Sequence, residues 1–338
     1  MMTNGSSLPV TELPGWHHLW KYIAYICEGS LTSFSNLLVV LSILRYTALR
    51  MRSEYIVICG LGVADFLNQF AFLCAGLYRI MLIFLGTHDL KVSAWSCMLT
   101  LHNFFWIYTD TLAALMLMVV SLDRLFAVVA PLYYLANGKT AAYVLVSLGY
   151  GYSLVSGTIG VLLTYLYMGE DKVHANTCFI ATIITKRFHL YYNLIRHVFA
   201  CASIVFYVLV GLFYLKSQAE VETHDDVDQR AQMQRQRKVT RTLAITVVCT
   251  LIFYEIPLSV VLMSTVLDVN VKFFHDIILY CFMTANLNPM LNVLVYIKRH
   301  KEIRKAMMGL VTNRALPPNL GLWNLEATQK VAPAQSKQ

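Results

Sequence analysis

Charged side chains are scarce in this chain of 338 residues. They account for 14% of it, whereas apolar residues account for 57%. About a quarter of the residues of a soluble domain are charged, so this chain has too few charges to cover a surface that faces water. We therefore expect an integral membrane protein. The net charge of +8 does not indicate nucleic-acid binding, because the Lys and Arg residues gather at the ends of apolar segments, as they do in membrane proteins.

Sequence motifs of enzymes are also missing. The chain has no His-Glu-x-x-His motif, no glycine loop for phosphate and no nucleophile elbow, so we expect neither catalysis nor a cofactor. It has no internal repeat, and the alternating strands of about 10 residues that build outer-membrane barrels are absent. Residues 1–20 lack the apolar run of a cleavable signal peptide.

Seven long apolar segments make up most of the chain. They cover residues 21–45, 55–81, 97–125, 140–166, 189–215, 240–267 and 272–297. Because roughly 20 apolar residues cross a bilayer as a helix, the predicted fold class is all-α, a seven-transmembrane helix bundle over residues 21–310. A tail precedes it at 1–20, and a tail that we expect to be disordered follows at 311–338. Within 298–310, Ile303 and Met307 lie four residues apart, which predicts an amphipathic surface helix.

The distribution of positive charge predicts the orientation. The loops on one side of the predicted bundle carry 16 Lys and Arg residues, and those on the other side carry 7. Since the more positive side is cytoplasmic, we expect the N-terminus outside and the C-terminus inside a multi-pass protein of the plasma membrane. Cys97 and Cys178 then face the oxidising side, where disulfides persist. We predict that they form a disulfide, the alternative being two free thiols. Asn4, on the same side, begins a glycosylation sequon.

Polar motifs inside the apolar segments point to one family. Asp123-Arg124 ends the third segment and is followed by Pro131-Leu132, while Asn288-Pro289 lies in the seventh. An acid–arginine pair at the end of an apolar helix is costly in lipid and so indicates a function. Together these motifs resemble the rhodopsin-like (class A) G-protein-coupled receptors, over about residues 20–310.

The resemblance implies a role for each motif. Arg124 would pair with Asp123 at rest and turn toward a heterotrimeric G protein when the helices separate, because guanidinium donors are rigid and always charged. The alternative is an ordinary interface pair that snorkels to the membrane surface. Pro257 and Asn288-Pro289 would bend their helices. Asn292 stands where the family has a tyrosine that moves on activation, which leaves the switch role of this position open.

A second set of polar residues predicts a core inside the bundle. In the family an acid in the second span, here Asp65, can hold a sodium ion. The residues expected to help are Asn36, Thr284 and Asn288, but Ala113 replaces the hydroxyl that the third span usually supplies. The alternative is a protonated Asp65 that is hydrogen-bonded to Asn288. Beyond a possible sodium ion we expect no metal.

Asp110 and Glu255 form an unusual pair of acids in the third and sixth segments. In the family geometry their carboxyl groups would be neighbours, and two like charges there would not both persist. Three interpretations are open: Arg196 neutralises them, they share a proton, or they recognise a cationic group of a ligand.

The ligand site is expected among the outer halves of the helices. Aminergic receptors of the family carry an acid where this chain has Trp106, so a monoamine ligand is disfavoured. The predicted ligand-contacting residues are Trp106, Asp110, Tyr191, Tyr192, Arg196, Glu255 and His275.

The fourth segment departs from the family pattern. It lacks the usual tryptophan and carries Ser153, Ser156, Gly157 and Gly160, and small residues four apart permit close helix approach. With the short tails, these departures resemble the serpentine chemosensory receptors of nematodes.

The predicted function is that of a G-protein-coupled receptor for an extracellular ligand, either a small chemosensory molecule or a peptide. Its partners would be that ligand, a heterotrimeric G protein and membrane lipids. A receptor-like protein that does not signal is one alternative. A proton-linked transporter that uses Asp65, Asp110 and Glu255 is another, although the chain lacks an inverted repeat.

Overall fold

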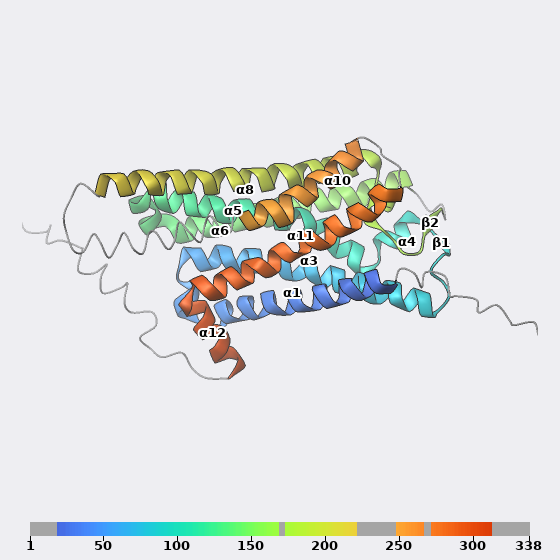
Figure 1. Ribbon diagram of the computed structural model, residues 1–338, viewed down its shortest axis with the longest axis horizontal. Coiled ribbons are helices and arrows are strands. Elements are labelled where there is room, and N and C mark those ends of the chain that lie inside the picture. Colours follow the sequence, from blue (N-terminus) through green and yellow to red (C-terminus); the bar gives the residue numbers. More distant parts are fainter. Residues whose placement is uncertain (1–18, 169–172, 222–247, 267–271, 313–338) are drawn as a thin grey trace, which may run out of the picture.

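Long helices run side by side along one axis (Figure 1). The computed structural model describes residues 19–168, 173–221, 248–266 and 272–312, and within these the side chains of 214, 217–221, 264–265, 272–279 and 282 are not described. The long helices are α1 (Leu19–Arg45), α3 (Ser53–Phe84), α5 (Leu101–Val129), α6 (Pro131–Met168), α8 (Lys186–Val221) and α11 (Lys272–Arg299). The π-helical turn η2 (Leu251–Glu255) and α10 (Ile256–Val266) form one further rod.

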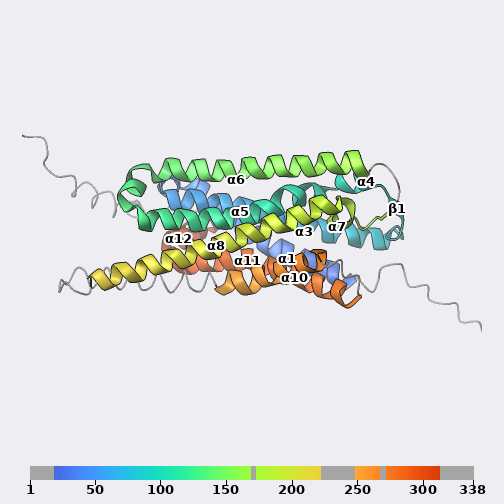
Figure 2. The same ribbon diagram turned by 90° about the horizontal axis from the view of Figure 1, so that it is seen from above.

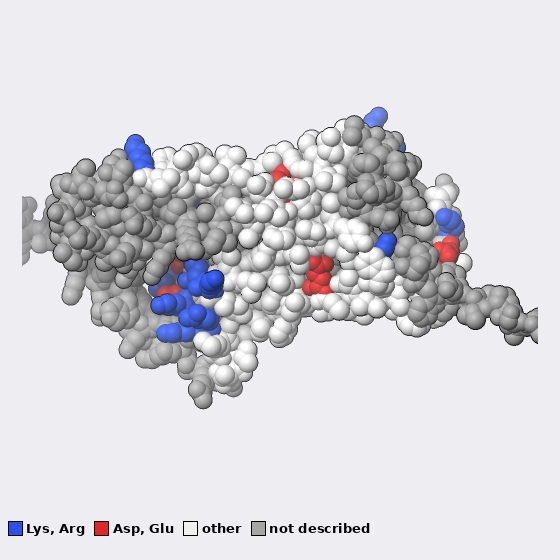
Figure 3. Space-filling view, viewed as in Figure 1, with Lys and Arg blue, Asp and Glu red and all other residues white. Residues whose placement is uncertain are grey.

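Several of these helices have the length and composition of membrane spans. Among the described residues α1, α3, α5, α6 and Lys186–Phe213 of α8 qualify, and Val248–Met263 forms a shorter apolar helix. The side of the bundle in Figure 3 is almost free of charge between its two ends. Large apolar side chains are exposed on the helices, and on α6 these include Leu148 and Leu154. Such a surface is stable when lipid rather than water covers it.

α5 occupies the centre of the bundle and α6 its edge (Figure 2). α5 packs against α3, α6 and α8, and its buried residues include Leu112, Met116 and Val120. On α6 the buried residues are mostly small, as the sequence predicted for Ser153, Ser156, Gly157 and Gly160. A Cβ atom at Gly160 would lie 2.5 Å from the ring of Phe188, so close contact between α6 and its neighbours depends on this glycine.

Gly29 brings α1 and α3 together even more closely. A Cβ atom there would lie 2.6 Å from the backbone nitrogen of Leu73 and 2.9 Å from the carbonyl oxygen of Gln69. Backbone atoms cannot move away as the end of a flexible side chain can. Gly29→Ala should therefore lower the free energy of unfolding by about 1–3 kcal/mol. Thermal unfolding of the purified protein measures this. Gly151→Ala is the matched control, because nothing lies within 4 Å of its Cβ position; equal stability of the two variants would contradict the close approach.

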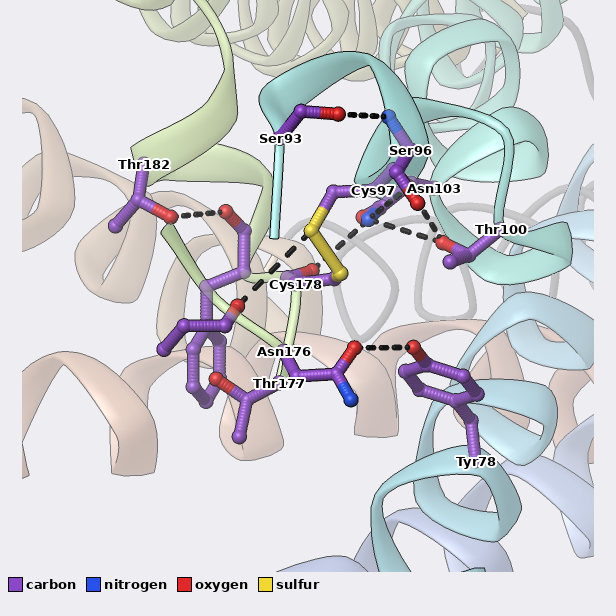
Figure 4. The surroundings of a disulfide bond; sticks show 12 residues. Tyr78, Ser93, Ser96, Cys97, Thr100, Asn103, Asn176, Thr177, Cys178 and Thr182 are labelled. Carbon is purple, nitrogen blue, oxygen red and sulfur yellow. Dashed lines mark hydrogen bonds between the residues drawn. A yellow bond between two sulfur atoms is a disulfide. The ribbon is translucent and has the colours of Figure 1, made fainter. Parts of the chain in front are cut away.

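A disulfide marks one end of the bundle, hereafter the disulfide end. Cys97 of α4 (Ala94–Met98) is bonded to Cys178, which confirms the predicted pairing. The two short strands β1 (Lys91–Val92) and β2 (His174–Ala175) pair antiparallel beside it. As Figure 4 shows, the Asn103 amide faces this link: it donates to the carbonyl oxygens of Cys97 (3.0 Å) and Cys178 (2.9 Å). The segment after Cys178, which includes α7 (Ile180–Ile183), is thereby fixed over the helix ends.

The opposite end, hereafter the Arg124 end, carries α2 (Thr47–Arg50) and α12 (Lys301–Val311). α12 buries Ile303, Ala306 and Gly309 and exposes Lys301, Arg304 and Lys305, so the predicted amphipathic helix is confirmed. Lys and Arg gather around it in Figure 3. A basic, half-apolar helix at this place suits the surface of a membrane.

Two prolines lie within the helices at the places where the sequence predicted bends. Pro289 lies inside α11. Pro257 follows the π-turn η2, a feature that the sequence did not reveal. Because π-turns insert an extra residue into a helix, η2 changes which side of the sixth rod each side chain faces.

Candidate functional site

A cavity opens among the helices near the disulfide end. It encloses about 820 Å³, counted to its open mouth. Its walls combine aromatic rings with amides and charged groups, a composition typical of ligand sites. The principal lining residues are Tyr25, Asp65, Asn68, Gln69, Phe72, Arg79, Trp106, Asp110, Phe179, Ile180, Arg196, Tyr254, Asn286 and Asn288.

An ion pair crosses the cavity between α5 and α8. Arg196 Nη1 lies 2.7 Å from Asp110 Oδ2, and the Tyr192 hydroxyl donates to the same carboxylate (3.0 Å) and to the carbonyl oxygen of Trp106 (3.0 Å). Arg196 is almost completely buried. This is the first of the three interpretations of the acid pair, in which Arg196 is the neutralising cation, but it applies to Asp110 alone.

Glu255 does not meet Asp110. Its Oε1 atom lies 2.7 Å from His197 Nδ1 and accepts from the Cys201 thiol at 3.0 Å. Glu255 is therefore absent from the cavity wall, and the expectation of neighbouring carboxyl groups is corrected. The π-turn accounts for the difference, since one added residue rotates the following side chains by about 100°.

Of the remaining residues that were predicted to contact a ligand, some line the cavity and others do not. Trp106 lines the cavity. Tyr191 points away from it, because its hydroxyl lies 2.6 Å from that of Tyr152 on α6. Consecutive residues of a helix point about 100° apart, so Tyr191 cannot share the direction of Tyr192. His275 lies outside the residues whose side chains are described, and Asn4 lies outside the described residues altogether.

Arg79 is a cavity residue that the sequence analysis missed. It is completely buried, although the sequence placed it near the end of the second segment and counted it with the outer charges. Asp65, Gln69, Phe72 and Arg79 all line the cavity, and their spacing of four, three and seven residues places them on one helix face. This spacing in the sequence could have predicted that Arg79 shares a helix face with Asp65.

The predicted polar core is only partly assembled. Asp65 and Asn288 both line the floor of the cavity and are buried. Asn36 donates to the carbonyl oxygen of Thr32 on its own helix (3.0 Å), and Thr284 donates to that of Tyr280 (2.7 Å). Asn292 interacts with Asp65, but its amide nitrogen and Asp65 Oδ2 lack a hydrogen-bond partner among the described residues. A sodium site with Asp65 as its only acid thus remains a prediction.

A second network surrounds Arg124 at the other end of the bundle. Arg124 Nη2 lies 3.1 Å from Asp123 Oδ2, which is the predicted pair. Its Nη1 atom also donates to Glu54 of α3 at 3.1 Å, a partner that the sequence did not predict. The hydroxyl of Tyr134 on α6 donates to Asp123 (3.0 Å) and accepts from Ser53 (2.8 Å). Arg124 therefore joins α5 to α3, and Tyr134 joins α6 to both of them.

A crevice adjoins this network. It encloses about 520 Å³ and is lined by Arg124, Tyr207, Asn292, Tyr296, Arg299 and His300, among others. His300 lies between α11 and α12, where burial lowers its pKa to about 4. The imidazole is therefore neutral near pH 7, and the positive charge at this point comes from the neighbouring arginines.

Comparison with known proteins agrees with this architecture. Residues 35–296 match the profile of the 7 transmembrane receptor (rhodopsin family). The chain belongs to this family. It is 24% identical to human trace amine-associated receptor 6 over 341 aligned positions, which cover 95% of this chain and 93% of the receptor. The chimpanzee receptor of the same name matches at the same identity and coverage.

Family membership gives the two sites their context. Members of this receptor class are multi-pass membrane proteins that signal through G proteins, and they are not normally enzymes. In this family member, the cavity near the disulfide and the Arg124 network lie toward opposite ends of one bundle. The acid that lines the cavity on α5 is already paired with Arg196.

Proposed function

We propose that this chain is a plasma-membrane receptor that binds an extracellular ligand in the cavity near the disulfide and activates a heterotrimeric G protein at the Arg124 end. The observation that carries the proposal is the Arg124 network. An arginine with a buried acid on its own helix and a second acid on a neighbouring helix can hold an inactive arrangement. Its release would free rigid, permanently charged donors for a partner.

The crevice beside Arg124 supports the same assignment. Asn292 and Tyr296 of α11 line it together with Tyr207 of α8, so movement of α11 or α8 would change its shape. Pro289 lies one turn from Asn292 in α11 and supplies a flexible point. Asn288, beside it, is in contact with the cavity, which connects the proposed ligand site with the proposed coupling site.

A ligand would act through differential affinity. It shifts the balance between inactive and active arrangements only if it binds one of them more tightly. The Asp110–Arg196 pair lies where such a ligand would bind. The relatives named as trace amine-associated receptors suggest an amine, but in this chain an amine would have to displace Arg196 from Asp110.

Dissociation of G-protein subunits in living cells tests the proposal. Cells expressing the chain are exposed to a library of small molecules and peptides, with one reporter for each class of G protein. We expect a ligand-dependent response that Arg124→Ala abolishes, with surface expression retained. A response that persists in Arg124→Ala would contradict the coupling role. Ligand binding by the purified protein without any G-protein response would instead favour a receptor-like protein that does not signal.

A further inference from the structure

Two donor nitrogens of the Arg79 guanidinium lack a well-placed acceptor among the described residues. Its side chain is fully buried, and its Nε atom donates to the carbonyl oxygen of Thr177 at 3.0 Å. The Nη1 and Nη2 atoms make no hydrogen bond of normal geometry in the described part of the chain, although the Tyr25 hydroxyl lies close enough to interact with the guanidinium. The residue lines the cavity, so these two nitrogens are the candidates for contact with a molecule bound there, although the side chain itself exposes no surface to solvent.

Aromatic rings surround the guanidinium. The Phe179 ring centre lies 4.1 Å from Cζ, and the rings of Tyr22, Tyr25 and Trp106 lie 5.7–5.8 Å away. Ring faces attract a cation. They do not replace hydrogen bonds, however, and they do not neutralise a charge.

No acid among the described residues compensates this charge. Asp110 is held by Arg196 at 2.7 Å. Asp65 lies on the same helix as Arg79 but 14 residues away, which is about 21 Å along the axis. A buried charge without a partner is strongly unfavourable, so the arrangement is best suited to a state in which another molecule supplies the anion.

We infer that Arg79 is the recognition site for the carboxylate group of a small organic acid. The two free nitrogens of a guanidinium match the two oxygens of a carboxylate. Phe72, Trp106, Phe179 and Ile180 provide apolar walls beside it, so the acid carries an apolar or aromatic body. The inference rests on the proposed function for its signalling consequence, but the binding itself does not require a G protein.

The loop after the disulfide completes this site. Thr177 and Phe179, which contact Arg79, flank Cys178. The cysteine itself is tied to Cys97, and the Tyr78 hydroxyl donates to Asn176 Oδ1 at 3.0 Å (Figure 4). The groups that hold the guanidinium are therefore fixed before a ligand arrives, which lowers the entropic cost of binding.

Thermal unfolding of the purified full-length protein tests the inference. The probes are phenylacetate, hydrocinnamate, cinnamate and hexanoate, each beside its uncharged primary amide. We expect at least one acid to raise the melting temperature while its amide does not. In Arg79→Gln the apparent affinity for that acid should fall about 10- to 100-fold, as expected when charge-assisted hydrogen bonds are lost. Arg79→Lys, which keeps the charge but loses the planar fork, should bind with intermediate affinity.

The controls separate recognition from general effects of charge. Arg50→Gln removes an exposed cation at the Arg124 end and should leave acid binding unchanged. The inference is overturned if no acid stabilises the wild type more than its amide, or if the acid effect survives in Arg79→Gln. Acid binding without G-protein activation would contradict the proposed function alone, whereas G-protein activation by ligands that are not acids, with no acid binding, would contradict this inference alone.

Discussion

Replacing Glu54 by Gln should raise the activity of this receptor in the absence of ligand. The carboxylate of Glu54 lies 3.1 Å from Arg124 and links α3 to α5. Both side chains are largely shielded from water, and a hydrogen bond to a charged group contributes about 1.5–3 kcal/mol. Since the amide of Gln keeps part of this bond, we expect a loss of about 1–2 kcal/mol from the inactive arrangement. That loss changes the balance of states by roughly 5- to 30-fold.

Basal G-protein dissociation at matched surface expression measures this effect. Glu302→Gln is the control, because Glu302 lies at the same end and contacts Tyr55 and Arg52 rather than Arg124. Basal activity in Glu54→Gln no higher than in Glu302→Gln would show that the contact with α3 does not hold the inactive state.

Breaking the Asp110–Arg196 pair should have the largest effect on stability. Arg196→Met would leave the Asp110 carboxylate in the cavity with the Tyr192 hydroxyl as its remaining described partner. Removing one member of a buried ion pair costs about 3–5 kcal/mol, because the other charge remains uncompensated. The double variant Asp110→Asn/Arg196→Met removes both charges and should regain most of that loss.

Thermal unfolding of the purified variants provides this comparison as a double-mutant cycle. Arg187→Met is the matched control, since Arg187 is exposed on the same helix and should be nearly neutral. Additive losses in the two single variants would contradict a coupled pair. Equal stability of Arg196→Met and Arg187→Met would show that the ion pair of Arg196 does not stabilise the fold.

Features that depend on local sequence could be predicted. The approximate positions of the long helices follow from runs of apolar residues, although α6 begins nine residues before the predicted segment. α12 follows from the four-residue spacing of Ile303 and Met307. The Asp123–Arg124 contact joins adjacent residues at the end of a helix. The Cys97–Cys178 bond follows from orientation, because both residues belong to the predicted outer side.

Features that depend on how one helix is rotated relative to another could not be predicted from the sequence. Glu255 faces His197 rather than Asp110, because the π-turn changes the phase of the sixth rod. Glu54 reaches Arg124 across 70 residues of sequence, and no motif marks it. Arg79 lies near the end of the second predicted segment, yet its side chain is buried and donates to the carbonyl oxygen of Thr177 in the loop after strand β2. In each case a tertiary contact, and not the local pattern, decides where the charge lies.

The most direct test of the account is GDP release from purified G-protein heterotrimers, one class at a time, mixed with the receptor in lipid vesicles. The Glu54→Gln variant is used, because its predicted activity does not depend on a known ligand. We predict that it accelerates GDP release from at least one class and that the double variant Glu54→Gln/Arg124→Ala does not. Acceleration that persists without Arg124, or no acceleration by Glu54→Gln with any class, would contradict the claim that this network couples the receptor to a G protein.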